Sequence, residues 1–143
     1  MQDAFYASGF LYNLKSQQIL LLQPQQIEEI TSLWSMLGGE SKEGEEAPIT
    51  FQRIVNEVLS VKLEVEDIHP IYDYFHDSLD KMNYVFYAEV KAPLSVDSFK
   101  DSNLSWVSFI DAPKLPFSPH TKQDVIVGER VINLKRRLAL NLQ

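Results

Sequence analysis

Acidic, basic and glycine residues recur at fixed spacings in one stretch of the chain. Gly39 is followed by five residues and then by Glu45, seven more residues separate Glu45 from Arg53, and Glu57 stands four residues after Arg53. A loop that feeds a helix N-terminus offers free N–H groups to anions, and carboxylates are the hard oxygen ligands that Mg²⁺ prefers. These residue types at these spacings therefore indicate phosphate and metal chemistry.

The glycine-rich loop leads into a segment with the pattern of a half-buried helix. Pro48 suits the first helical turn, where its missing N–H is not needed. Arg53 and Glu57 are spaced i, i+4, so they can pair on the helix surface. Apolar residues follow the i, i+3, i+4, i+7, i+8 pattern of a buried stripe, at Phe51, Ile54, Val55, Val58 and Leu59.

At these residues the chain resembles the Nudix hydrolase family. The motif of that family, the Nudix box, reads Gly, five residues, Glu, seven residues, then Arg-Glu-apolar-x-Glu-Glu-x-Gly-apolar. The matching positions between Gly39 and Val61 are Gly39, Glu45, Arg53, Val55, Glu57 and Val61. The chain departs from the box where the family has Glu, Glu and Gly, at Ile54, Val58 and Ser60. We call this a degenerate Nudix box.

The resemblance implies a role for each matching residue. Glu57 corresponds to a metal ligand and catalytic group, and the backbone carbonyl of Gly38 corresponds to a further ligand. Glu45 and Arg53 correspond to catalytic-site positions that hold the loop and the helix together, and Glu45 lies near the metal in some members. The implied ion is Mg²⁺ or Mn²⁺, which would hold the phosphate oxygens of the substrate and activate water.

The two lost carboxylates limit what this site can do. Ile54 and Val58 are spaced i, i+4 and lie along the same stripe, so one acidic ridge of the helix has become apolar. An ion left with Glu57 and one carbonyl would bind weakly. The sequence therefore predicts a hydrolase of a nucleoside diphosphate-linked substrate with reduced or lost activity. Two alternatives stay open: a non-catalytic module that binds a nucleotide or metabolite, and an interaction domain that uses the apolar ridge for assembly.

Several other residues could contribute, although no motif assigns them. Asp97 and Asp101 occupy a later loop of the kind from which the family often takes a further carboxylate. The acids around the double glycine are interpreted as a solvated loop, at Glu40, Glu43 and Glu46. The three histidines show no close metal-ligand spacing and are interpreted as surface or hydrogen-bonded residues, at His69, His76 and His120. Strand aromatics are interpreted mainly as core rather than as stacking partners for a base, at Tyr6, Phe10, Tyr84, Phe86 and Tyr87.

Composition excludes several classes of function. The formal net charge of −7 argues against nonspecific binding to nucleic acid, so we expect a small-molecule nucleotide or diphosphate ligand and no nucleic acid. The absence of cysteine excludes disulfides, zinc-thiolate sites and a cysteine nucleophile. No segment has the pattern of a secretory signal or a membrane span. We therefore expect a cytoplasmic protein without a membrane partner, and a homodimer is left open.

The pattern along the chain predicts a layered fold. Strands are predicted at residues 4–14, 19–23, 82–90 and 104–110, with one strand or two, broken at Pro70, within 61–77. Residues 27–37 are read as a short helix or a strand, and residues 38–47 as a loop. A terminal helix is predicted to begin at Thr121 and to bury a stripe, at Val127, Val131, Leu134 and Leu138. This order predicts one domain over residues 1–143, an α+β fold of the Nudix type with a mixed sheet in an α/β/α sandwich.

Overall fold

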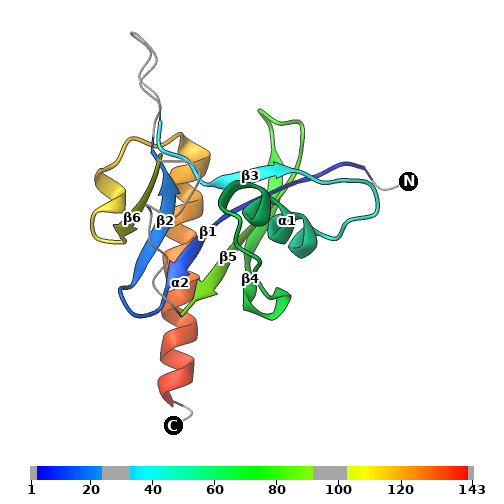
Figure 1. The fold of residues 1–143 in the computed structure, drawn as a ribbon. Coiled ribbons are helices and arrows are strands. Elements are labelled where there is room, and N and C mark those ends of the chain that lie inside the picture. The colour runs from blue at the N-terminus through cyan, green and yellow to red at the C-terminus, as the bar shows by residue number, and fades with distance from the viewer. Residues whose placement is uncertain (1–2, 24–32, 92–102, 142–143) are drawn as a thin grey trace.

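A mixed sheet of six strands runs through the computed structural model, which describes residues 3–23, 33–91 and 103–141 (Figure 1). The strands are β1 (Tyr6–Asn13), β2 (Gln18–Leu22), β3 (Leu37–Glu40), β4 (Ile68–His76), β5 (Lys81–Val90) and β6 (Leu104–Ser108). The two α-helices are α1 (Ala47–Leu59) and α2 (Pro119–Asn141). Short 3-10 turns lie at Val65–Asp67 and Ala112–Lys114.

Strand β1 organises the sheet because it pairs on both of its edges. It runs parallel to β5 along one edge, and its two halves pair antiparallel with β3 and β2 along the other. The strand order is β4-β5-β1-β2-β6, with β3 beside β1. The division between the two halves falls next to Gly9, where a Cβ would lie 2.0 Å from the carbonyl oxygen of Phe86. This close approach of two backbones requires glycine at that position.

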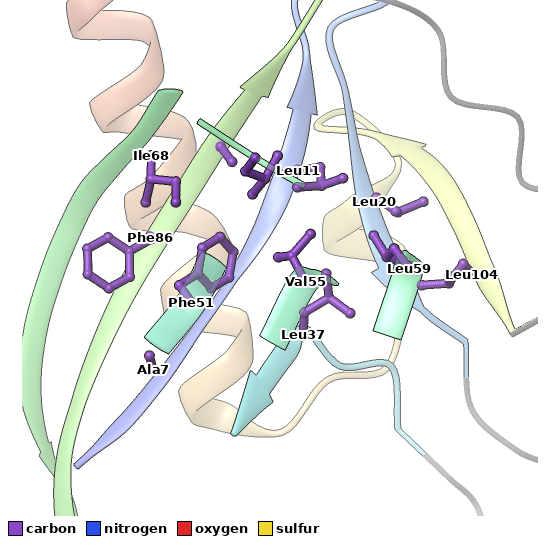
Figure 2. Packing of buried hydrophobic residues seen from close by; sticks show 12 residues of the cluster. Ala7, Leu11, Leu20, Leu37, Phe51, Val55, Leu59, Ile68, Phe86 and Leu104 are labelled. Carbon is purple, nitrogen blue, oxygen red and sulfur yellow. The ribbon is translucent and has the colours of Figure 1, made fainter. Parts of the chain in front are cut away.

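The two helices cover opposite faces of the sheet and divide the core in two. Alternate residues of a strand point to opposite faces, so Leu11 packs toward α1 while Phe10 and Tyr12 pack toward α2. Figure 2 shows the α1-side cluster, in which Phe51, Val55 and Leu59 meet residues of the sheet. Both faces of β1 are therefore buried, and this explains why its sequence alternates imperfectly. The predicted α+β fold, an α/β/α sandwich around a mixed sheet, is confirmed.

Helix α1 begins as its sequence predicts and ends in a left-handed cap. Pro48 stands in the first turn, and the predicted apolar stripe faces the sheet. The helix ends at Ser60, whose φ of 57° is left-handed and whose N–H donates to the carbonyl of Asn56 at 2.9 Å. Ser60 occupies the box position where the family has glycine. Glycine adopts this conformation without strain, so this departure keeps the backbone of a helix C-cap at some energetic cost.

The predicted loop at residues 38–47 is shorter than expected, because the double glycine belongs to β3. A Cβ on Gly38 would lie 2.7 Å from the ring of Tyr6, and one on Gly39 would lie 3.1 Å from Ile54 Cδ1. The glycines are therefore explained by close packing within a strand rather than by loop flexibility. The region predicted as helix or strand at 27–37 lies partly outside the described residues, and Trp34 and Ser35 make isolated bridges before β3 begins.

Pro70 bends a strand without ending it. Strand β4 runs from Ile68 to His76 as one strand, and its register against β5 shifts between Pro70 and Tyr72. The missing N–H of proline is tolerated here because β4 lies at the edge of the sheet. The alternative of two separate strands is wrong.

Helix α2 starts earlier and buries a different face than predicted. The cap is Ser118 rather than Thr121, since the Thr121 N–H lies 3.4 Å from the Ser118 hydroxyl. Gly128 lies within the helix, and a Cβ there would lie 2.8 Å from Phe10 Cζ, so glycine lets helix and sheet approach closely. The predicted stripe is only partly right, because Leu134 and Leu138 are more than half exposed. The buried positions of the helix are Asp124, Val125, Gly128 and Ile132.

Neither helix in the described ranges is long and apolar enough to cross a membrane.

Candidate functional site

Arg53 is the centre of a polar network that joins the glycine-rich loop to helix α1. Its Nε lies 2.7 Å from Glu45 Oε2, and its Nη2 lies 3.0 Å from Glu45 Oε1, so the two side chains form a bidentate pair. Nη2 also donates to the backbone carbonyl of Glu40 at 2.8 Å, and Nη1 donates to Glu57 Oε1 at 3.2 Å. The predicted residues Glu45, Arg53 and Glu57 are thus brought together as one network.

Glu45 has both oxygens occupied by protein donors. Besides the two bonds from Arg53, its Oε1 accepts bonds from the Lys42 N–H at 2.7 Å and from the buried Thr50 hydroxyl at 3.1 Å. The hydrogen bond from Arg53 lowers the pKa of Glu45 to about 2, with further help from the bonds of Lys42 and Thr50. In this arrangement Glu45 holds the loop on the helix, and each of its oxygens already accepts at least one hydrogen bond from the protein.

Glu57 is the box carboxylate that remains accessible. Its side chain is 55% exposed, and its Oε1 lies 4.0 Å from Lys42 Nζ as well as 3.2 Å from Arg53. Gly38, whose carbonyl was predicted as a further ligand, lies in β3 opposite Ser8. The part of the chain that the structure describes places no cluster of three His, Cys, Asp or Glu donors at the box. Asp97 and Asp101 lie outside the described residues.

The two positions that replace family carboxylates belong to the layer between helix and sheet. Ile54 is 4% exposed and packs against Gly39, and Val58 is partly buried against the α1-side cluster. The donors that the described residues offer at the box are thus Glu57, the Gly38 carbonyl and an engaged Glu45. Mg²⁺ is usually held by one or two carboxylates together with water and substrate oxygens, so an ion at the box would have few protein ligands among the described residues.

Two cavities open beside the loop, on the side of Glu45 rather than of Glu57. The larger, of about 880 Å³, lies between the residues that precede β1, the start of α1 and the β4–β5 turn. The smaller, of about 460 Å³, lies against the 41–45 loop. Glu45 contributes to the walls of both. Lys81 and Tyr84 also line the larger cavity, and Lys81 is already paired with Glu40.

A third cavity, of about 190 Å³, lies on the opposite face of the sheet, under the first turns of α2. Its wall holds the buried carboxylate of Asp124, which accepts hydrogen bonds from the hydroxyls of Tyr72 at 2.6 Å and Tyr74 at 3.1 Å. Desolvation raises the pKa of Asp124, although the two tyrosine bonds oppose the shift. Ser8 and Asn83 complete a polar floor, joined by a 3.0 Å hydrogen bond.

Sequence reasoning did not single out this α2-face cavity. Asp124 is 2% exposed, and its carboxylate accepts hydrogen bonds from two tyrosines of β4. One available signal was the pair Tyr72 and Tyr74, which share a strand face because they are two residues apart. The predicted core aromatics Phe10, Phe86 and Tyr87 are buried as expected; of the others, Tyr6 lines this cavity and Tyr84 the larger one.

Comparison with known proteins gives matches by structure but none by sequence. No protein-family profile matches the chain, and no curated protein matches it. A mutT/nudix family protein from Listeria innocua has a TM-score of 0.73 at 16% identity, over 96% of this chain and 99% of that one. The Nudix domain of Shewanella oneidensis NrtR, complexed with ADP ribose, has a TM-score of 0.66 at 16% identity, over 92% and 90%.

Two further structures show that proteins of this shape have varied partners. Shewanella oneidensis NrtR complexed with a 27mer DNA matches with a TM-score of 0.68 at 17% identity, over 92% of this chain and 63% of that one. The C-terminal domain of mouse MUTYH, complexed with human PCNA, matches at 0.67 and 12% identity, over 92% and 91%. The expectation that nucleic acid is not a partner therefore finds no support in the comparisons. With two helices on opposite faces of a six-stranded mixed sheet and these structural neighbours, the chain has the Nudix fold.

Proposed function

We propose that this chain is a degenerate Nudix protein that binds a nucleotide or another nucleoside diphosphate-linked metabolite and hydrolyses it slowly or not at all. The observation that carries the proposal is that Ile54 is 4% exposed between α1 and the sheet, and that Val58 is partly buried against the same layer. These positions hold apolar side chains where the resembled family has ligands. Their burial also argues against an interaction domain built on an exposed apolar ridge.

Glu57 is the residue on which any remaining catalysis depends in this proposal. A Mg²⁺ or Mn²⁺ ion at the box would have Glu57 and the Gly38 carbonyl as its available protein ligands, since Arg53, Lys42 and Thr50 already occupy Glu45. Diphosphate hydrolysis relies on such an ion to hold phosphate oxygens and to activate water. Two ligands hold an ion weakly, so we expect low activity that needs high concentrations of metal.

Recognition without turnover would use the polar groups of the α2-face cavity, which lies across the sheet from the box. Ser8, Asn83 and Asp124 offer donors and acceptors, and Tyr6 and Tyr74 offer ring surface. Its volume of about 190 Å³ suits one ring system rather than a whole nucleotide. The ADP ribose bound by the Nudix domain of NrtR supports nucleoside diphosphate compounds as the first class to test.

Two assays on the same purified protein separate binding from turnover. We expect ADP ribose to raise the melting temperature equally with and without EDTA, because a ligand that binds only the folded state stabilises it. We expect little product release with Mg²⁺ or Mn²⁺. Asp124→Asn should reduce the thermal shift, whereas Glu64→Gln, at an exposed acid away from the cavity, should leave it unchanged.

Rapid metal-dependent hydrolysis would overturn the proposal. The informative variant is then Glu57→Gln, which exchanges an exposed carboxylate for an amide of the same shape. Loss of activity in a variant whose melting temperature is unchanged would show that Glu57 works in a complete metal site, completed by other carboxylates of the chain.

A further inference from the structure

Two histidines and an aspartate far apart in the sequence meet at one end of the sheet. His76 is the last residue of β4, Asp77 begins the turn to β5, and His120 lies in the first turn of α2. One potential ligand atom from each residue lies within 4.8 Å of the other two. The imidazole centroids of His76 and His120 are 4.0 Å apart, and His120 Nε2 lies 3.0 Å from Asp77 Oδ1. We call this group the His–Asp–His cluster.

An ordinary ion pair accounts for only part of the cluster. The contact between His120 and Asp77 is satisfied as a solvent-accessible pair. His76 Nδ1, in contrast, is buried and has no hydrogen-bond partner among the described residues. A buried polar atom without a partner costs free energy. A cation coordinated through His76 Nδ1 would supply the missing partner.

We propose that His76, Asp77 and His120 form a binding site for a divalent first-row transition ion, for which Zn²⁺ is the probe. Imidazole nitrogen suits zinc, nickel and copper, whereas Mg²⁺ prefers oxygen ligands. Two histidines and one carboxylate also form a familiar zinc ligand set that leaves a coordination position open. Zn–N distances of 2.0–2.1 Å place tetrahedral ligand atoms about 3.3 Å apart, close to the existing 3.0 Å between His120 Nε2 and Asp77 Oδ1. The two imidazole rings, tilted by 39°, must rotate to aim a nitrogen each at the same ion.

The surroundings of the cluster favour a cation and limit its movement. The ring of Tyr74 stacks on both imidazoles, with centroid distances of 6.0 Å to His76 and 5.7 Å to His120. The buried carboxylate of Asp124 lies one helical turn after His120, and its hydrogen bond from Tyr74 ties it to the same strand. His76 and His120 also line the α2-face cavity. An ion between them would therefore lie at the wall of that cavity, and an open coordination position there could take an anionic group of a ligand.

This site is separate from the Nudix box, and its test does not depend on the proposed function. The protein is prepared without a polyhistidine tag and treated with EDTA, and Zn²⁺ binding is then measured by isothermal titration calorimetry and by competition with a chromophoric chelator. The chain contains three histidines in all, which provides a matched control. His69 lies beside Glu89, 3.8 Å away, and is outside the cluster.

We expect one Zn²⁺ per chain, retained in millimolar Mg²⁺. His76→Gln and His120→Gln should each weaken binding by at least about 10–100-fold, the loss that follows removal even of outer metal-site partners. His69→Gln should bind as the unaltered chain does. Because Asp77 lies in an exposed turn, Asp77→Asn should keep the fold and still weaken Zn²⁺ binding. This variant therefore tests the site even if a histidine variant unfolds.

Several results would overturn the proposal. Substoichiometric binding in the unaltered chain is one, and equal loss in the His69→Gln variant is another. Binding that survives Asp77→Asn together with His120→Gln would also refute it. Loss of binding in Glu57→Gln with retention in the cluster variants would place the ion at the Nudix box instead.

Discussion

Ile54→Glu restores the carboxylate that the Nudix box calls for, and the structure predicts that the fold will resist it. Ile54 is 4% exposed, and its Cδ1 lies 3.1 Å from where a Cβ on Gly39 would stand. The substitution removes part of the roughly 1.5–3 kcal/mol that a buried isoleucine contributes. The introduced carboxyl must then be buried, either charged or protonated.

The cost of protonation sets the size and the pH dependence of the effect. With an ordinary Glu pKa of about 4.3 and about 1.36 kcal/mol per pH unit, keeping the group neutral at pH 7.5 costs up to about 4 kcal/mol. We therefore expect a total loss of roughly 3–6 kcal/mol at pH 7.5, a large share of a typical folding stability. Because burial raises the pKa in the folded state, the folded chain binds more protons than the unfolded chain. Stability should then fall as pH rises above about 4.3, and the variant should be least destabilised near pH 4.5.

Urea unfolding at pH 4.5, 6 and 7.5 measures this effect, with Ile54→Gln as the control. Glutamine has nearly the same shape but does not titrate. The difference in unfolding free energy between the two variants therefore gives the pH dependence that is due to the introduced carboxyl, without that of the other titrating groups of the chain. Both variants should be less stable than the unaltered chain, and only Ile54→Glu should lose further stability with rising pH. An Ile54→Glu chain within about 0.5 kcal/mol of the unaltered one at pH 7.5, the range of ordinary surface substitutions, would refute the burial argument. In that case the position faces solvent and can supply a metal ligand.

Three further substitutions test other features of the fold by equilibrium unfolding. Ser60→Gly should stabilise the chain by about 0.5–1 kcal/mol, because its φ of 57° is strained for serine and free for glycine; a destabilised variant would show that the serine side chain matters more than the backbone. Gly128→Ala should destabilise the chain by about 1–2 kcal/mol, because the added Cβ would lie 2.8 Å from Phe10 Cζ. This cost should exceed the better helix propensity of alanine, and a gain in melting temperature would contradict the packing. Glu45→Gln should cost about 1–2 kcal/mol at pH 7, allowing for solvent screening of its pair with Arg53. Because the folded pKa of Glu45 is lowered from 4.5 to about 2, the unfolded chain binds the extra proton; the cost should therefore shrink as pH falls from 4.5 toward 2, and a pH-independent cost would refute the charged pair.

Local pattern was enough to predict most elements of the fold. Strand β5, helix α1 and the strands β1 and β2 follow from runs of β-branched and aromatic residues or from helical spacing. The errors lie where packing overrides local preference. Gly38 and Gly39 were predicted as part of a loop and belong to a strand, because in each case a neighbouring side chain occupies the space of a Cβ. Sequence alone does not show which side chain that is.

The candidate site was likewise predicted in part from the sequence and decided in part by tertiary packing. The sequence by itself determined that Glu45, Arg53 and Glu57 share one motif and that Ile54 and Val58 break it, since fixed spacing along a loop and a helix places those residues together. The helical pattern also placed Ile54 on a buried stripe, whereas only the tertiary structure decided that it packs against Gly39 and that both oxygens of Glu45 are engaged. It also brought His76 against His120, 44 residues later, and set Asp124 beneath two tyrosines. Such contacts form where the end of a strand packs against the start of a helix. The number of residues between two side chains does not predict how far apart they lie in the folded chain.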